Sequence, residues 1–264
     1  MKSSTPVQSP NFPATCWTSE EFKRLKREEE RKCLKETYEF LRLLCKKLHR
    51  SHIIVNTSMF FFLKYTRIYS FATINKFLVA SACLLLGAKC QDEPIPIEFL
   101  VEWYIWCETK RQANDSKIDI SEHKKQDYSS RIQEQEFDIL CELGFDCEVD
   151  LPNKYISQFA ASPIGKAIYS KFNIGRYSTM FANDSFTTTC SLYYTPQQIA
   201  AASIYMASIY LTTSGKVPKL SDMDLNAPQN TEWYASIDET LDIDIITEVK
   251  GEIKKCYAKK TSSS

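Results

Sequence analysis

The chain has 264 residues and a mass of 30.5 kDa, enough for one large domain or for two of about 100–130 residues each. Its 33 lysines and arginines balance 33 aspartates and glutamates, so the formal net charge is zero. Proteins that hold a polyanion by counterion release carry surplus basic residues. The charge balance therefore argues against direct binding of nucleic acid or of an acidic membrane by the bulk of the protein.

Glycine is scarce, with only 6 residues in the chain. Phosphate-binding loops, tight hairpins and β-bulges all need glycine, so its scarcity favours an all-helical fold. No two glycines stand close enough for a dinucleotide fingerprint, a phosphate loop, a kinase glycine-rich loop or a nucleophile elbow. The sequence thus excludes the enzyme classes that depend on these loops.

The ten cysteines do not form a metal or redox motif, because no pair has the two-residue gap of a zinc knuckle or a thioredoxin-like site. His49 and His52 lie three residues apart, but no cysteine or acid stands at a suitable spacing nearby. We therefore expect no metal and no cofactor. The polar N-terminus does not resemble a signal peptide, so reduced thiols in a cytosolic or nuclear protein are expected.

The N-terminal residues 1–18 contain three prolines and are predicted to form a flexible arm. Thr18 or Ser19 can cap a helix whose first turn carries acidic residues. This helix is highly charged as far as Arg31 and should be solvated there. From Leu34 apolar residues recur at helical spacing, which predicts an amphipathic helix to about residue 48.

Four more helices are predicted before residue 150. They cover about 55–68, then a segment from Thr73 or Asn75 to about Lys89, then a helix that starts at the prolines 94 and 96, and finally 131–143. The helix that ends near Lys89 is apolar nearly all round and should be buried. Residues 109–130 are polar and are predicted to form a long exposed loop, and Gly144 should end the fifth helix.

The second half repeats this layout at an offset of 120 residues. Helices are predicted at about 153–171, at about 176–190, at a buried stretch capped by Thr195 with Pro196 in its first position, and at about 242–258. Glycine and proline at 215 and 218 should end the buried helix. The predicted organisation is a flexible arm at 1–18, a first unit at 19–150, a second unit at 151–258 and a flexible tail at 259–264.

The segment from Val79 to Pro96, VASACLLLGAKCQDEPIP, resembles the third helix of the first cyclin box. In that family an alanine-rich helix ends in Ala-Lys-hydrophobic-Glu-Glu before a proline. Lys89 is present, whereas the Glu-Glu pair reads Gln91-Asp92. The fifth predicted helix supplies a second landmark, in which the family has a glutamate nine residues before a Phe-Asp or Phe-Glu pair. Glu136 and Phe145 keep that spacing.

Within the cyclins, the chain most resembles the transcriptional cyclins K and T, over about residues 17–258. Residues 56–71, NTSMFFFLKYTRIYSF, are similar to their second helix. Residues 181–207, FANDSFTTTCSLYYTPQQIAAASIYMA, are similar to their second box and are the most specific signal. The Met-Arg-Ala-Ile-Leu patch of cell-cycle cyclins is absent from residues 36–44, so substrate recruitment through that patch is not expected.

The resemblance implies an all-α fold of two tandem five-helix cyclin boxes, with an extra N-terminal helix and a C-terminal helix. It also implies a nuclear, non-catalytic subunit that binds and activates a cyclin-dependent kinase, one that phosphorylates the C-terminal repeats of RNA polymerase II and promotes elongation. Such a subunit holds the C-helix of the kinase inward, where a glutamate pairs with the lysine that orients ATP.

The resemblance assigns kinase binding to Lys89 and Glu136, with apolar contacts from Phe99 and Trp103. Lys89 at a helix C-terminus can complement the helix dipole and still donate outward. Without the resemblance, dipole compensation and a solvated acidic face explain the two residues. Trp103 and Trp106 can share one helix face, and core packing is the alternative explanation for both.

Two other functional classes stay open at this stage. One is a TFIIB-like helical transcription factor that binds promoter DNA and polymerase, against which the zero net charge and the absence of a zinc ribbon argue. The other is a helical hydrolase, against which the missing glycine loops and metal spacings argue. Among cyclins, types L, C and H also remain possible.

Overall fold

The computed structural model describes residues 19–69, 73–112, 121–166, 174–213 and 233–257, and the regular elements of that part are all helices. The predicted arm at 1–18 and tail at 259–264 lie outside the described residues. The helices of the first half are α1 (Ser19–Lys47), α2 (His52–Thr66), α3 (Lys76–Cys90), α4 (Ile97–Gln112) and α5 (Glu122–Glu142). Those of the second half are α6 (Pro152–Ala161), α8 (Ile174–Ser185), α9 (Cys190–Tyr193), α10 (Pro196–Thr213) and α11 (Ile243–Lys254), with short 3-10 helices at Trp233–Ser236 and Lys255–Tyr257.

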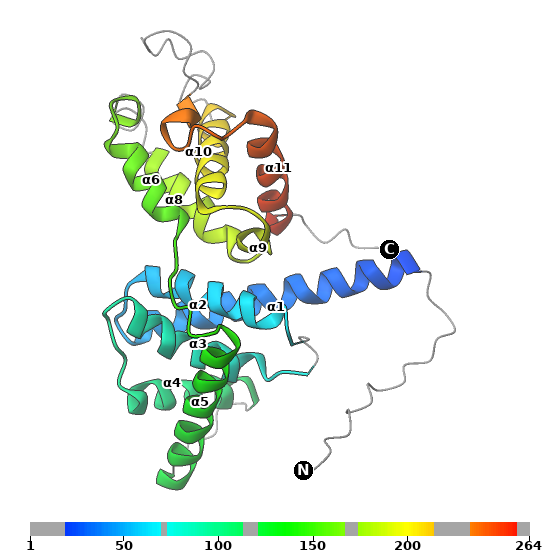
Figure 1. Cartoon of the computed structure of the whole chain (residues 1–264). Coiled ribbons are helices and arrows are strands. Elements are labelled where there is room, and N and C mark those ends of the chain that lie inside the picture. The colour runs from blue at the N-terminus through cyan, green and yellow to red at the C-terminus, as the bar shows by residue number, and fades with distance from the viewer. Residues whose placement is uncertain (1–18, 70–72, 113–120, 167–173, 214–232, 258–264) are drawn as a thin grey trace.

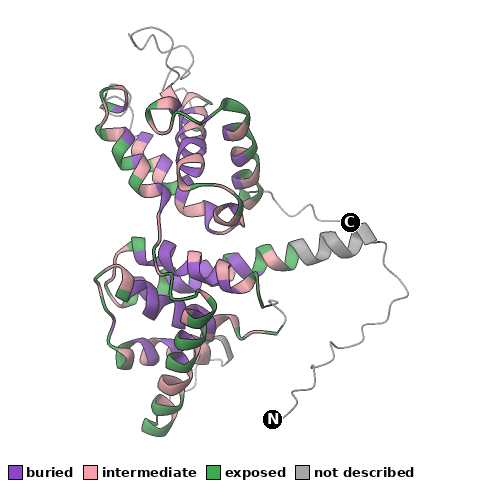
Figure 2. Ribbon diagram, viewed as in Figure 1, coloured by how far each residue is buried: buried purple, intermediate pink, exposed green. Residues whose placement is uncertain are grey.

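Each half has its own hydrophobic core, and one central helix runs through each (Figures 1 and 2). In the first half α3 is buried from Val79 to Ala88, and in the second half α10 is buried from Ile199 to Ile204. Both helices were predicted to be buried because they are apolar nearly all round. α1 is one continuous helix, and its N-terminal part projects beyond the rest of the first half (Figure 1).

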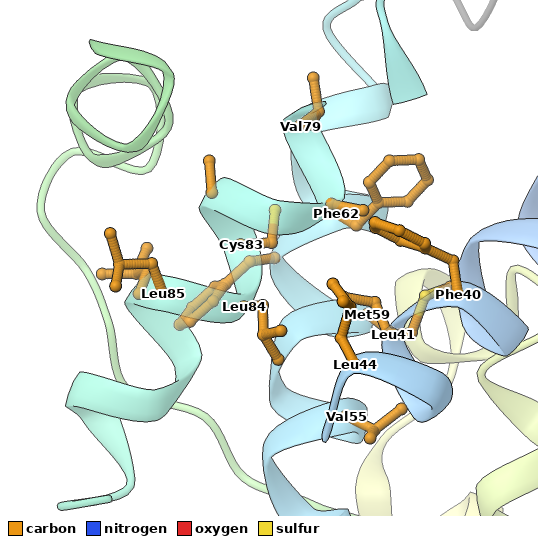
Figure 3. Packing of buried hydrophobic residues seen from close by; sticks show 14 of the residues in the cluster. Phe40, Leu41, Leu44, Val55, Met59, Phe62, Val79, Cys83, Leu84 and Leu85 are labelled. Carbon is orange, nitrogen blue, oxygen red and sulfur yellow. The ribbon is translucent and has the colours of Figure 1, made fainter. Parts of the chain in front are cut away.

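The small residues of α3 let α2 approach closely, as the packing around Cys83 and Leu84 shows (Figure 3). At the closest point, a Cβ on Gly87 would lie 2.8 Å from Oγ of Ser58 and 3.3 Å from its backbone nitrogen. Ser58 is fully buried, and its hydroxyl donates to the carbonyl of Ile54 on its own helix. Glycine at position 87 is therefore required by the spacing of the two helices.

The helix starts were predicted well where a side chain caps them. Asn75 caps α3, since its side chain accepts from the backbone N–H of Leu78. Thr195 and Gln198 form a reciprocal capping box at the start of α10, in which each side chain accepts from the backbone N–H of the other. These bonds satisfy backbone donors that a helix start leaves unpaired.

The predicted exposed loop at 109–130 is wrong at both of its ends. α4 continues to Gln112 and α5 begins at Glu122, while 113–120 lie outside the described residues. Tyr128 of α5 packs against Tyr104 with ring centroids 5.1 Å apart, and its hydroxyl donates to Glu108. Contacts with α4 therefore hold a polar segment helical, although its sequence carries few apolar residues to indicate it.

Two helices of the second half are shorter than predicted. The helix predicted at 153–171 ends at Ala161, and the Ser162 hydroxyl accepts from the N–H of Gly165 where a new turn starts. The helix predicted at 176–190 ends at Ser185 and is followed by a turn and by α9. In this turn the hydroxyls of Thr187 and Thr188 donate to the backbone carbonyls of residues 184 and 185, and such local side-chain hydrogen bonds favour a turn over a continued helix.

Two features join the halves. Asn56 of α2 is 1% exposed, and its Nδ2 donates to Oδ1 of Asn183 at 2.8 Å and to Oδ1 of Asn153 at 3.2 Å. Phe186 follows α8 in the second half, but its ring is buried in the core of the first half. The asparagine cluster fixes direction, because its hydrogen bonds are directional, while Phe186 contributes apolar burial.

We predict that Gly87→Ala lowers the free energy of unfolding by about 1–2 kcal/mol. Overpacking a tight core costs about 1–3 kcal/mol, which exceeds the gain of up to about 1 kcal/mol from replacing a helical glycine. Gly251→Ala is the matched control, because a Cβ there meets nothing within 4 Å, and it should raise stability. Urea unfolding measures both, and Ser58→Ala should restore part of the Gly87→Ala loss. A Gly87→Ala protein more stable than the wild type contradicts the prediction.

We also predict that Asn56→Ala lowers the free energy of unfolding by about 1–3 kcal/mol, because it leaves buried amide groups without their partner. Since the lost bonds join the halves, the two should unfold less cooperatively and the urea dependence should become shallower. Coincident transitions by fluorescence and by circular dichroism, with an unchanged midpoint, contradict this prediction.

Candidate functional site

Lys89 and Glu136 meet on the surface of the first half. Lys89 lies in the last turn of α3, and Glu136 lies on the face of α5 that packs against α3. The lysine Nζ is 2.7 Å from Oε1 and 2.9 Å from Oε2 of the glutamate, to which it donates a hydrogen bond. The structure therefore brings together the two polar residues that the sequence singled out.

The two partners differ in exposure. The Glu136 side chain is 8% exposed, and that of Lys89 is 54% exposed. Burial of a carboxylate is costly unless a cation and hydrogen bonds compensate it, so the glutamate depends on the lysine. An ammonium group has three N–H donors, and the exposed side of Lys89 leaves donors free for a second protein. The pair presents a fixed positive group on the surface.

Two thiols continue this surface beside Lys89. Cys90 ends α3 and Cys147 follows α5, and both are half-buried against the core of the first half. Burial, together with the neighbouring Cys147 thiol, raises the pKa of Cys90 to about 11. The Cys90 thiol is therefore protonated at neutral pH and acts as an apolar group here rather than as a nucleophile.

Two phenylalanines that lie close in sequence to Glu136 are exposed and were not predicted as site residues. Phe137 follows Glu136 on α5 and is 60% exposed, and Phe145 is 64% exposed just beyond the end of α5. The spacing from Glu136 to Phe145 pointed to the second of these residues, but periodicity gave no indication that either ring faces solvent. Large exposed apolar rings beside a fixed charge are typical of a protein-binding surface.

Phe145 is held in a strained backbone conformation. Gly144 and Phe145 both have φ near 60°, and the N–H of Phe145 donates to the carbonyl of Leu140. Glycine adopts this left-handed region freely, as predicted for the end of α5, whereas an aromatic residue does so at a cost of about 1–3 kcal/mol. The turn thus holds the Phe145 ring outward at an energetic cost.

The residues predicted on α4 have separate surroundings. Phe99 is 58% exposed, whereas Trp103 is half-buried and packs edge-on against Trp106, with ring centroids 5.6 Å apart. Nζ of Lys47, at the end of α1, lies 4.8 Å from the Trp103 ring centroid. The tryptophans therefore share a face, as predicted, and that face lies beside α1. Within the described residues, the hydrogen bonds and ion pairs of Lys89 and Glu136 join these two residues to each other and not to Phe99 or Trp103.

The described residues offer no arrangement typical of a metal site, since no three histidine, cysteine or acidic side chains gather there. His52 makes a hydrogen bond of 3.1 Å with the Tyr38 hydroxyl, and its burial lowers the pKa of the imidazole. No helix among those described is long and apolar enough to cross a membrane.

We predict that Phe145→Asn raises the free energy of unfolding by about 1 kcal/mol. Asparagine tolerates the left-handed region, and the exposed ring contributes little to burial. Phe145→Ala is the control: it removes the ring but keeps a Cβ in the same conformation, so its stability should stay within about 0.5 kcal/mol of the wild type. Urea unfolding compares the three proteins, and a destabilised Phe145→Asn protein contradicts the prediction.

Comparison with known proteins points to the cyclins. No model of a known protein family matches the chain. The chain is similar to cyclin-T1 of Mus musculus (22% identity over 82% of this chain and 28% of the relative) and to cyclin-T of Drosophila melanogaster (25% identity, 81% and 17%). It is also similar to human cyclin-K (21% identity, 76% and 32%). The chain thus spans less than a third of the length of these relatives.

Solved structures show the same fold. The structure of the yeast RNA Pol II CTD kinase CTDK-1 complex contains a chain that matches with a TM-score of 0.67 and 19% identity, over 95% of this chain and 76% of that one. The CAK complex of Chaetomium thermophilum bound to ATP-γ-S contains another, with a TM-score of 0.56 and 15% identity, over 88% and 64%. The predicted all-α cyclin-type fold and the resemblance to transcriptional cyclins are confirmed.

Proposed function

We propose that this chain is the activating regulatory subunit of a cyclin-dependent kinase of the transcriptional type, acting in the nucleus on the C-terminal repeats of RNA polymerase II to promote elongation. The observation that carries the proposal is the buried-acid, exposed-lysine pair formed by Lys89 and Glu136, flanked by exposed phenylalanines on a cyclin-type fold. The chain itself does no chemistry in this role, and its similarity to cyclins supports that assignment.

Activation follows from preferential binding of one kinase conformation. Lys89 can donate to the backbone carbonyls or carboxylates of a docked kinase helix. Glu136 holds the ammonium group of Lys89 in a fixed position for this contact. Phe137 and Phe145 can bury their rings against the same helix. A subunit that contacts the kinase C-helix only in its inward position binds that kinase conformation more tightly than the others. Binding therefore shifts the kinase population toward the conformation with the inward C-helix.

The energetics favour a stable heterodimer over a transient contact. Subunit interfaces of this kind bury on the order of 2,000 Å² or more. Most of the binding free energy comes from a few central aromatic or charged residues that lose their water on binding. The phenylalanines at 137 and 145, each more than half exposed in the free chain, are suited to that role.

We predict that Lys89→Ala combined with Glu136→Ala leaves the fold intact and weakens kinase binding at least about tenfold, because a central charged contact is lost. The tagged chain is purified from nuclear extract, the bound kinase is identified by mass spectrometry, and its affinity for both forms is then measured. Lys35→Ala with Glu39→Ala, on an exposed face of α1, is the control and should bind normally. Unchanged binding of kinase by the Lys89/Glu136 variant contradicts the proposal.

Phe145→Asn separates binding from folding. The same substitution that relieves backbone strain removes the exposed ring, so it should weaken kinase binding while the protein becomes no less stable. Kinase activity toward a peptide of polymerase C-terminal repeats should fall in parallel at a fixed subunit concentration. If the Phe145→Asn variant binds and activates the kinase as well as the wild type does, the Phe145 ring is not part of the interface.

A further inference from the structure

A groove of about 390 Å³ lies between the two halves, and neither Lys89 nor Glu136 lines it. Its floor is apolar and includes Phe186 and Ile199, each 1% exposed. Phe60 of α2 forms part of one wall. The lining of the groove therefore combines residues from both halves, and the groove exists only because the halves are held together.

The rim of the groove is acidic. The connection between α5 and α6 is a single extended segment (Figure 1). Asp146, Glu148 and Asp150 occupy every second position of it, and all three line the groove. No lysine or arginine lines it. Asp150 is paired with Lys154 at 3.2 Å, whereas the described part of the chain places no cation against Glu148. Glu148 is thus the rim acid whose charge no described cation compensates, because Asp146 also has a lysine partner, Lys64.

Two lining residues of the groove, Phe60 and Asp146, already contact a basic side chain of the chain itself. Nζ of Lys64 lies 4.7 Å from the Phe60 ring centroid and 3.9 Å from Oδ2 of Asp146. An aromatic face and a carboxylate together attract a basic side chain more strongly than either does alone. Glu148 stands two residues further along the same rim, and it offers a second carboxylate that no lysine of the described chain contacts.

The buried Ser191 hydroxyl also lines the groove, and it has no hydrogen-bond partner in the described part of the chain.

We propose that this groove, between α2, α9, α10 and the α5–α6 connection, binds a short segment of a partner protein in which an arginine or lysine stands next to an apolar side chain. The basic group lies against Glu148 and Asp146, and the apolar side chain packs against the half-buried Phe60 and Tyr194 of the lining. An arginine fits best, because its planar guanidinium can pair with a carboxylate through two hydrogen bonds. The groove is then a docking site for a partner peptide.

The occupant is a peptide and not a free metal or a polyanion, for reasons of chemistry. The acidic rim repels phosphate groups. Among the described residues, no three acidic, histidine or cysteine side chains gather closely enough to hold a metal ion. Glu148, which has no cation partner among the described residues, favours a segment with a basic residue. The apolar part of the lining favours an apolar residue next to it. This inference does not depend on the proposed kinase partner, because the groove residues are other than those assigned to kinase binding.

A phage-displayed library of random dodecapeptides tests the proposal, selected on the wild-type chain after depletion on the Asp146→Asn/Glu148→Gln variant. We expect the enriched peptides to share an arginine or lysine beside an aliphatic or aromatic residue. A synthetic, fluorescein-labelled copy of the most enriched peptide should lose at least about tenfold in affinity for that variant by fluorescence anisotropy. Its affinity for the wild type should also fall as ionic strength rises.

The controls separate the groove from charge and from folding. Glu239→Gln removes an exposed acid outside the groove and should leave the affinity unchanged. Glu148→Lys should weaken binding more than Glu148→Gln does, because it adds repulsion. The variants should unfold at the wild-type urea midpoint and should retain kinase binding. Peptides without a basic residue, equal binding to the Asp146→Asn/Glu148→Gln variant, or a dimer of the chain that this variant abolishes each overturn the proposal.

Discussion

The close approach of α2 and α3 is the constraint on which the first half depends. Gly87 lies where a Cβ would be only 2.8 Å from the buried Ser58 hydroxyl, so the two helices pack nearly backbone to backbone there. This contact sets the position of the last turn of α3, which ends three residues beyond Gly87, and so places Lys89 beside α5. Small residues in a central helix thus determine the position of a charged group on the surface.

The surface beside that contact combines features that cost free energy on their own. Glu136 is a carboxylate removed from water, and its stability depends on Lys89. Phe145 holds a backbone conformation that is strained for an aromatic residue. Exposed rings and buried charges of this kind are difficult to explain by folding alone. They are consistent with a surface that is completed when another protein binds.

The two halves are coupled by a small number of specific contacts. The hydrogen bonds of Asn56 and the burial of Phe186 place α2 against the second half, and the acidic groove lies along the same boundary. Because each half has its own core, the relative placement of the halves depends on few interactions. A substitution at this boundary should therefore affect partner docking in the groove before it affects the core of either half.

Local signals in the sequence determined the helical fold, the two buried central helices, and the caps at Asn75 and Thr195, because periodicity and capping act within a few residues. The cyclin resemblance singled out Lys89 and Glu136. Their contact across 47 residues, the helical start of α5 beside α4, and the exposure of Phe145 were decided only by tertiary packing. The inter-half groove has no local signature at all, since distant segments form it and their distance depends on the whole fold.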